Sequence, residues 1–123
     1  MRVYLSGGMK SGWQDEMPKI DGVEYFDPRC DSPQSKSAID FVSSDIEGVK
    51  KSDLVFCYIE KDNPSGFGAA WECAIAKENN IPIITVWEKD YIDPFFACNS
   101  LYLYSNFEKG KERLIRYVID RVK

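Results

Sequence analysis

Short apolar runs alternate along this chain with segments whose apolar residues recur at helical spacing. Apolar runs with strand-like length predict β-strands at residues 3–5, 23–26, 54–59, 81–87 and 101–104. The run at 54–59 is apolar throughout, which is typical of a strand buried on both faces of a sheet. We therefore expect other elements to cover both faces of this strand.

Helices are expected between these strands. Ile39, Val42, Ile46 and Val49 recur at helical spacing and predict a helix over 38–50 with one inward stripe. The other expected helices cover residues 12–17, 67–80 and 107–122, and the polar or Pro-containing segments expected to form loops are 29–37 and 90–100.

This alternation predicts an α/β fold in a single domain over residues 1–123. Right-handed crossovers place helices on both faces of a parallel sheet, and five strands favour the flavodoxin-like, Rossmann-like order 2-1-3-4-5. Ligands of such sheets bind beyond the carboxyl ends of the strands, near the switch point between strands one and three. The loops at 6–8, 27–29 and 63–68 are therefore expected to line one cleft.

The charge balance argues against a nucleic-acid partner. The net charge is −4, and the one basic concentration, residues 109–116, lies on an expected helix that also carries Glu108 and Glu112. Such a pattern is typical of a solvated helix face. No apolar run approaches the ~18 residues of a membrane span, and no signal peptide is visible. We expect no membrane association and a cytoplasmic location.

The chain contains no histidine. Its absence excludes Ser-His and Cys-His nucleophile activation, His-rich zinc sites and histidine general bases. The Gly66-Phe67-Gly68 loop lacks the third glycine of a dinucleotide fingerprint, and the chain has no Gly-Lys-Ser/Thr sequence. We therefore expect no metal, no NAD and no Walker-type site, and we expect acid–base work to fall to carboxylates, Tyr, Lys or Cys.

Cysteines Cys30, Cys57, Cys73 and Cys98 stand far apart in the sequence, without a C-x-x-C pair. Cys57 and Cys73 fall in apolar segments that suit reduced, buried thiols. We interpret the four as structural thiols, and a nucleophilic cysteine or a disulfide is the alternative.

Glu72 is the single charged residue in the window 67–76, where the other nine residues are small or apolar. Burying a carboxylate costs several kcal/mol unless partners stabilise it, so packing alone explains Glu72 poorly. The alternative is a glutamate on the solvent face, or one favoured by the helix N-terminus. The window follows a Gly-rich loop, and this context favours a functional carboxylate.

Two more side chains could accompany Glu72. Asp45 falls on the edge of the inward stripe of its helix, and the alternative is a flanking position that reaches solvent. Tyr4 ends the first strand, where its hydroxyl could donate a hydrogen bond to Glu72; otherwise it is a core aromatic. Asp53 precedes the third strand and is interpreted as a turn or capping residue.

At this point the residues resemble a family, the nucleoside 2-deoxyribosyltransferases, together with the related deoxynucleoside-monophosphate N-glycosidases. The ordered segments that carry the resemblance are Val3-Tyr4-Leu5-Ser6-Gly7, Gly12-Trp13-Gln14-Asp15-Glu16, Tyr25-Phe26-Asp27-Pro28-Arg29, Asp45 ahead of Ser52-Asp53, and Pro64-Ser65-Gly66-Phe67-Gly68-Ala69-Ala70-Trp71-Glu72. The resemblance implies that Glu72 is the nucleophile, Tyr4 its orienting partner and Asp45 the group near the base. It also implies a homodimer or a higher homo-oligomer.

The fold and the resemblance together give a set of candidate substrate-binding residues. They are Ser6, Gly7, Met9, Trp13, Asp27, Arg29, Ser65, Gly66 and Gly68. Two departures from the family pattern concern substrate choice. Gly66 stands where transferases of the family often carry an acidic residue, and residues 94–99 hold no clear counterpart of the family's C-terminal asparagine.

Cleavage of an N-glycosidic bond passes through an oxocarbenium-like state, which a carboxylate stabilises and can attack. The resemblance implies cleavage of 2-deoxyribonucleosides through a deoxyribosyl-Glu72 intermediate, with transfer to another nucleobase and no cofactor. Hydrolysis of deoxynucleoside 5-monophosphates and a non-catalytic nucleotide-binding module are the alternatives. Residues 91–107 concentrate Tyr, Phe and Leu, so we expect part of this segment to face another subunit.

Overall fold

The computed structural model describes residues 1–32, 37–64 and 66–121 of the chain. Its strands form one parallel sheet in the order β2-β1-β3-β4-β5, which confirms the predicted α/β fold and strand order. The strands are β1 Arg2–Gly7, β2 Glu24–Phe26, β3 Leu54–Ile59, β4 Ile83–Trp87 and β5 Tyr102–Tyr104. Every residue of β3 is buried, as its continuous apolar run predicts.

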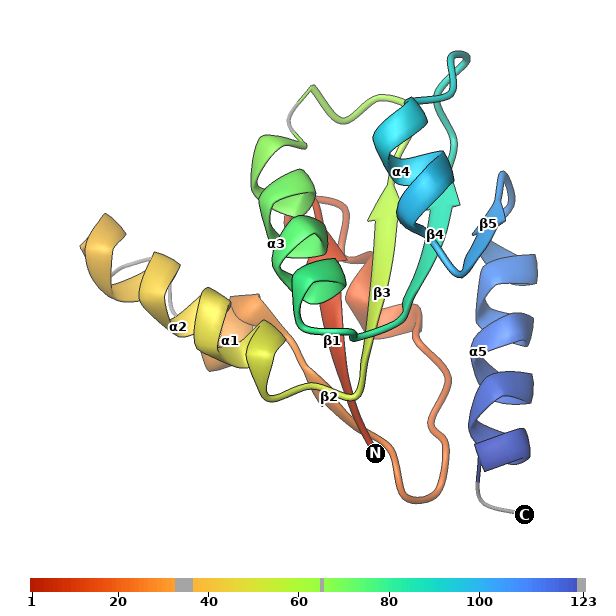
Figure 1. Ribbon diagram of the computed structural model, residues 1–123, viewed down its shortest axis with the longest axis horizontal. Helices are drawn as coiled ribbons and strands as arrows, with labels where there is room; N and C mark the ends of the chain where they lie inside the picture. The colour runs from red at the N-terminus through yellow and green to blue at the C-terminus, as the bar shows by residue number, and fades with distance from the viewer. Residues whose placement is uncertain (33–36, 65, 122–123) are drawn as a thin grey trace.

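Helices lie on both faces of the sheet (Figure 1). The elements are the 3-10 helix η1 Trp13–Glu16, and the α-helices α1 Pro28–Asp31, α2 Ala38–Lys50, α3 Phe67–Glu78, α4 Pro94–Asn99 and α5 Phe107–Arg121. One core joins η1 and α5 to the sheet, and the other joins α2, α3 and α4 to the opposite face. Among the described residues, none of these helices has the length and apolar character needed to cross a membrane.

Two segments expected to be loops contain short helices instead. Helices α1 and α4 each begin at an Asp-Pro pair, in which the aspartate caps the helix and proline occupies its first turn. The Asp27 carboxylate accepts from the backbone N–H of Arg29, and the Asp93 carboxylate accepts from those of Phe95 and Phe96. Proline suits the first helical turn because its fixed φ matches the helix and its missing N–H is not needed there.

The inward stripe of α2 is covered along only part of its length. Val49 is fully buried and Ile46 is partly buried, but Ile39 is 79% exposed and Val42 is 45% exposed. Figure 1 shows the reason, because the N-terminal half of α2 projects beyond the sheet. The helix bounds agree with the prediction, whereas the expectation that the whole stripe packs inward is wrong.

Alternation along β1 assigns its side chains to the two cores. Val3 and Leu5 belong to the core under α5, whereas Tyr4 lies in the core under α2 and α3, and Ser6 follows on that same face. The strand ends at Gly7, whose φ is +148° and where a Cβ would lie 2.4 Å from the Tyr58 carbonyl oxygen. A glycine is therefore required at the point where the chain leaves β1 for the candidate site.

Candidate active site

The Glu72 carboxylate lies over the end of β1 and accepts one hydrogen bond on each oxygen. The Tyr4 hydroxyl donates to Oε2 at 2.6 Å, and the Ser6 hydroxyl donates to Oε1 at 2.8 Å. Tyr4 and Ser6 project from the same face of β1 because they are two residues apart in a strand. Of the two interpretations of Tyr4 left open by the sequence, the structure shows the hydrogen bond to Glu72.

The surroundings of Glu72 set the pKa of its carboxyl group near neutrality, where the charged and protonated forms are both populated. Burial raises the pKa of Glu72 to about 7, against the hydrogen bonds from Tyr4 and Ser6, which lower it. The charge of Asp45 adds a smaller upward contribution. Burial and the Glu72 charge raise the pKa of Tyr4 far above its ordinary value, so that its hydroxyl keeps its proton and remains a donor.

Asp45 lies on α2 and is 8% exposed, so the inward interpretation of this residue holds. Burial raises the pKa of Asp45, and the hydroxyl of Ser32 opposes this effect. Its Oδ1 atom has no hydrogen-bond partner among the described residues. The charge of Asp45 raises the pKa of both Glu72 and Tyr4, which indicates that Asp45 lies near them. A buried carboxylate oxygen without a partner is unusual, and it is available to accept a hydrogen bond from a ligand.

A small pocket of about 160 Å³ lies at the N-terminus of α3, the helix that carries Glu72. Its lining includes Gly7, Gly8, Gly66 and Gly68, so backbone atoms form much of its wall. Ala69 also lines it and lies one turn before Glu72 on the same helix. The described residues of the loops at 6–8 and 63–68 therefore converge, as the sequence predicts, whereas residues 27–29, which were expected in the same cleft, do not line this pocket. The candidate residue Ser65 lies outside the described residues.

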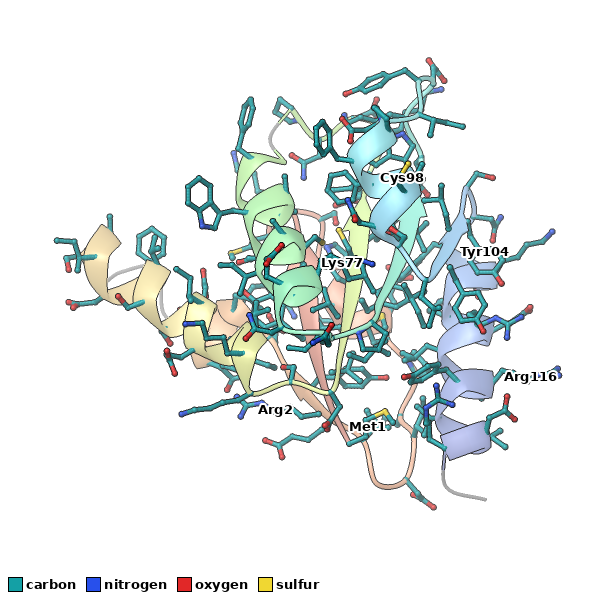
Figure 2. All side chains as sticks on the ribbon, in the orientation of Figure 1. Met1, Arg2, Lys77, Cys98, Tyr104 and Arg116 are labelled. Carbon is teal, nitrogen blue, oxygen red and sulfur yellow. The ribbon has the colours of Figure 1, made fainter. Side chains whose placement is uncertain are left out.

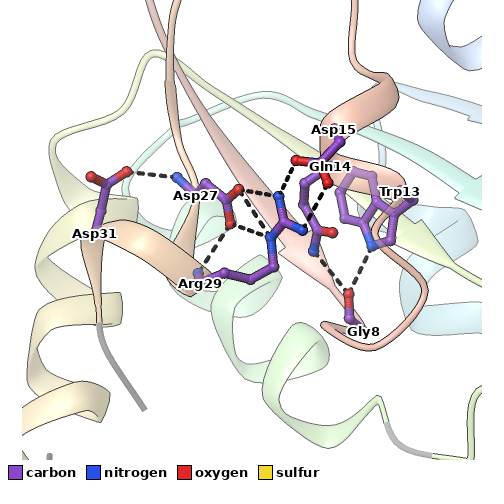
Figure 3. A network of polar contacts seen from close by, with 7 residues as sticks. All are labelled: Gly8, Trp13, Gln14, Asp15, Asp27, Arg29 and Asp31. Atoms are coloured by element: carbon purple, nitrogen blue, oxygen red, sulfur yellow. Dashed lines mark hydrogen bonds and ion pairs between the residues drawn. The ribbon is translucent and has the colours of Figure 1, made fainter. Parts of the chain in front are cut away.

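Asp27 and Arg29 form a separate network at the end of β2 (Figure 3). The Arg29 guanidinium pairs with Asp27 at 2.7 Å and with Asp15 at 2.8 Å. Hydrogen bonds to these two carboxylates raise the pKa of Arg29 above its ordinary value. Three of its nitrogens already donate to carboxylates, so Arg29 joins the loop after β1 to the loop after β2.

Trp13 and Gln14 hold the loop after β1 in place. The indole N–H of Trp13 and the side-chain amide of Gln14 both donate to the Gly8 carbonyl, at 2.8 and 2.9 Å. Figure 3 shows both side chains directed at Gly8. Trp13 is 2% exposed and packs in the core on the α5 side of the sheet, opposite Glu72. Trp13 therefore contributes to a ligand site indirectly, because it fixes the position of Gly8.

Met9 is not among the residues that line the small pocket at the N-terminus of α3. It lines a cavity of about 730 Å³ with Lys10, Glu60, Asp62 and other residues that follow β1 and β3. Gly7 and Gly8 line both this cavity and the small pocket beside α3. The larger cavity therefore borders the small pocket, and Glu72 lines neither of the two.

The cysteines and Asp53 have the structural settings that the sequence favours. Cys57 and Cys73 are buried, and all four cysteines are free thiols. Contact with Cys73, followed by burial, raises the pKa of the Cys57 thiol well above its ordinary value. The Asp53 carboxylate accepts from the backbone N–H of Arg2 at 2.8 Å, which fixes the turn before β3 against β1.

Ser6 and Ser32 have roles that the sequence reasoning did not assign. Ser6 was expected among the substrate-binding residues, but its hydroxyl donates to the candidate nucleophile. The period-2 spacing from Tyr4 is the signal that could have indicated this role. Ser32 affects Asp45 from the end of α1, a helix that the sequence reasoning did not include.

No protein-family model matches this chain, and no curated protein matches its sequence. The class of this protein is therefore described from its fold and from the geometry of its site. It is an α/β protein with a hydrogen-bonded carboxylate at the carboxyl end of β1, near the switch point of a 2-1-3-4-5 sheet.

Proposed function

We propose that this protein cleaves the N-glycosidic bond of 2-deoxyribonucleosides and transfers the deoxyribosyl group to another nucleobase. The observation that carries the proposal is the pair of hydrogen bonds that holds both oxygens of Glu72, one helical turn beyond a glycine-walled pocket at the N-terminus of α3. A carboxylate fixed in this way is oriented for attack on a sugar carbon before the substrate arrives. The resemblance to the nucleoside 2-deoxyribosyltransferases supports the same assignment.

In the first step, a carboxylate oxygen of Glu72 forms a bond to the anomeric carbon as the bond from that carbon to the base nitrogen breaks. The bonding electron pair leaves with the base, which takes up a proton. In the second step, a nitrogen of another base attacks the anomeric carbon and loses its proton to Asp45, while the bond from that carbon to Glu72 breaks and releases the carboxylate. A deoxy sugar suits this chemistry because a 2-hydroxyl would withdraw electrons from the cationic transition state.

Asp45 is the proposed source of the proton for the departing base. Burial raises its pKa, which increases the share of the protonated form, and its Oδ1 atom is unpartnered among the described residues. A protonated carboxyl group beside a leaving group acts as a general acid. Tyr4 and Ser6 act on Glu72 instead, since their hydroxyls orient it and stabilise its charged form.

A specific feature also favours a second candidate, hydrolysis of deoxynucleoside 5-monophosphates. The pocket at the N-terminus of α3 combines glycine backbone with the positive end of a helix dipole. A 5-phosphate would match this combination, and water would then replace the second base as the acceptor. The alternative to both enzymes is a module that binds a nucleotide without catalysing a reaction.

The proposal is tested by incubating the protein with a deoxynucleoside, its monophosphate and a second free base, and separating the products. A new deoxynucleoside indicates transfer, whereas free base with deoxyribose 5-phosphate indicates hydrolysis. Glu72→Gln should lower either activity at least about a thousandfold, because the transition state loses its compensating charge. Glu78→Gln, an exposed position on the same helix, is the matched control and should retain activity. Near-normal activity of Glu72→Gln would reject the nucleophile assignment, and binding without turnover by the wild type would favour the binding module.

A further inference from the structure

A row of buried polar side chains crosses the sheet beneath α3 and α4. Ser6, Cys57 and Thr85 are register partners on β1, β3 and β4, and all three are fully buried. Opposed residues of neighbouring strands project from the same face of a sheet. The outer two have partners above them, because Ser6 donates to Glu72 of α3 and Thr85 shares a hydrogen bond with Ser100 at the end of α4. Cys57 lies between these two contacts.

Cys73 of α3 is the neighbour of Cys57 on the overlying helix. It directly follows Glu72 in the chain, and it belongs with Cys57 to the core on this side of the sheet. Contact with Cys73 is the largest cause of the raised pKa of the Cys57 thiol, and burial is the next. Both thiols are free. A second thiol beside an oxidised cysteine allows the oxidation to end in a disulfide.

A cavity between α3 and α4 gives access to Cys73. Its volume is about 370 Å³, and Cys73 lines it together with apolar side chains of α3, β4 and α4. Figure 2 shows Lys77 on α3, where it also lines the cavity, and Cys98 on α4. Cys57 is fully buried and is not among the residues that line the cavity, whereas Cys73 is 7% exposed. A small oxidant that enters the cavity therefore meets Cys73 first.

We propose that Cys73 is an oxidation site for small hydroperoxides and that Cys57 resolves the oxidised form as a Cys57–Cys73 disulfide. In the first step, the Cys73 sulfur attacks one oxygen of the hydroperoxide and forms a sulfur–oxygen bond. The oxygen–oxygen bond breaks, and the other oxygen leaves with the thiol proton as an alcohol, or as water from hydrogen peroxide. The product is the sulfenic acid of Cys73.

In the second step, the Cys57 sulfur attacks the sulfur of this sulfenic acid. The sulfur–sulfur bond forms, the sulfur–oxygen bond breaks, and the hydroxide leaves as water with the proton of Cys57. The two thiols together lose two electrons, which reduce the hydroperoxide to alcohol and water. A dithiol reverses the oxidation by thiol–disulfide exchange.

The disulfide would affect the candidate active site through the position of Glu72. Cys73 adjoins Glu72 in α3 and Cys57 adjoins Ser6 in the sheet, so the new bond forms beside the hydrogen bond from Ser6 to Glu72. A misplacement of about 1 Å can lower a rate about a hundredfold. Oxidation should therefore lower the proposed activity at least about tenfold, and a dithiol should restore it. This effect rests on the proposed function, whereas formation of the disulfide does not.

A variant that keeps only this pair of thiols tests the proposal. Cys30 and Cys98 are exposed, so Cys30→Ser and Cys98→Ser remove the competing thiols without changing the core. After hydrogen peroxide, denaturation and alkylation, this protein should carry no alkyl group and should have the mass of one chain less two hydrogen atoms. Peptide mapping should find Cys57 and Cys73 in one cross-linked species. Treatment with a dithiol should make both thiols available to alkylation again.

Single-thiol variants in the same background test the order of the two steps. Cys57→Ala should stop at the sulfenic acid of Cys73, which a cyclic diketone reagent traps as an adduct. Cys73→Ala leaves Cys57 enclosed, so Cys57 should be oxidised at least about tenfold more slowly than Cys73 is in Cys57→Ala. Both substitutions place a small apolar side chain in the core and preserve the fold.

Substitution of Ala74, which lines the cavity, tests the route of access. Ala74→Phe should slow the oxidation of Cys73 at least about tenfold, because the ring occupies the cavity. Ala38→Phe, at an exposed position of α2, is the matched control and should not slow it.

Four results would overturn the proposal. They are thiols that all stay open to alkylation after peroxide, a sulfinic acid on Cys73 in place of the disulfide, equally fast oxidation of Cys57 in Cys73→Ala, and an unchanged rate in Ala74→Phe. Glu72→Gln should still form the disulfide, so a failure of the proposed chemistry at Glu72 is distinguishable from a failure of this oxidation site.

Discussion

At the scale of single residues, the ionisation of Glu72 results from two opposing influences. Burial raises the pKa of its carboxyl group to about 7, and the hydroxyls of Tyr4 and Ser6 hold it down by donating to the charged form. The two donors thus orient the carboxylate and keep it available as a nucleophile near neutral pH. When Asp45 is deprotonated, its negative charge opposes the two donors by raising the pKa of Glu72. Transfer of the Asp45 proton to the departing base therefore leaves an additional negative charge in the site.

The pH dependence of kcat/KM follows from this balance. The nucleophile acts as the carboxylate, so kcat/KM should rise with pH in a limb centred at about pH 7, and loss of the proton of the general acid Asp45 should lower kcat/KM again at higher pH. Tyr4→Phe keeps the ring that stacks on Phe26 but removes a donor to the charged form, so the pKa of Glu72 should rise and the limb should move to higher pH. Tyr25→Phe removes a hydroxyl that bonds to Pro18 and should leave the limb in place. An unchanged limb in Tyr4→Phe would contradict the orienting role.

Part of this site is predictable from the sequence. Glu72 is the one charge in an apolar window, and Tyr4 ends a strand, so the sequence indicates both. The role of the second donor, Ser6, is not predictable, because the sequence does not show which partner a serine hydroxyl has. The sequence leaves two positions open for Asp45, since a helical stripe defines a face but not how deeply its edge is buried.

At the scale of elements, the strongest predictions came from long, regular patterns. The bounds of β3 and α2 agree with the sequence, because the first is continuously apolar and the second has a clear helical period. Helices α1 and α4 have four and six residues, which are too few to show a period. The Asp-Pro pairs at which these two helices begin are the sequence signal that could have predicted them. The exposure of Ile39 and Val42 on the apolar stripe of α2 could not be predicted, because helical periodicity does not indicate where the sheet beneath the helix ends.

The turn after β1 gives a prediction on stability. A Cβ at Gly7 would lie 2.4 Å from the Tyr58 carbonyl oxygen, and its φ of +148° disfavours other residues. Gly7→Ala should lower the free energy of unfolding by about 2 kcal/mol or more. Gly68→Ala, in open space within α3, should be neutral or stabilise by up to about 1 kcal/mol. Urea denaturation of both variants measures the contrast, and equal stabilities would show that β1 can leave the sheet by another path.

At the scale of the whole molecule, the candidate chemistry and the exposed apolar surface belong to the same layer. Helices α2 and α3 supply Asp45 and Glu72 on their inner sides, and they also carry the exposed side chains of Phe67 and Trp71. The sequence predicts self-association through residues 91–107. Tyr91, Ile92 and Phe95 of that segment are exposed, and self-association stays a prediction. The opposite layer, with η1 and α5, positions the loop after β1 through Trp13.

The central claim is that Glu72 becomes covalently attached to the sugar, and mass spectrometry of trapped protein tests it most directly. A fluorinated deoxynucleoside analogue slows both steps by destabilising the cationic transition state, so the deoxyribosyl-enzyme should accumulate. After digestion, the peptide that contains Glu72 should carry the mass of the fluorinated sugar, and Glu72→Gln should carry none. Wild-type protein that turns over a deoxynucleoside but shows no adduct on Glu72, or an adduct on another residue, would contradict the account.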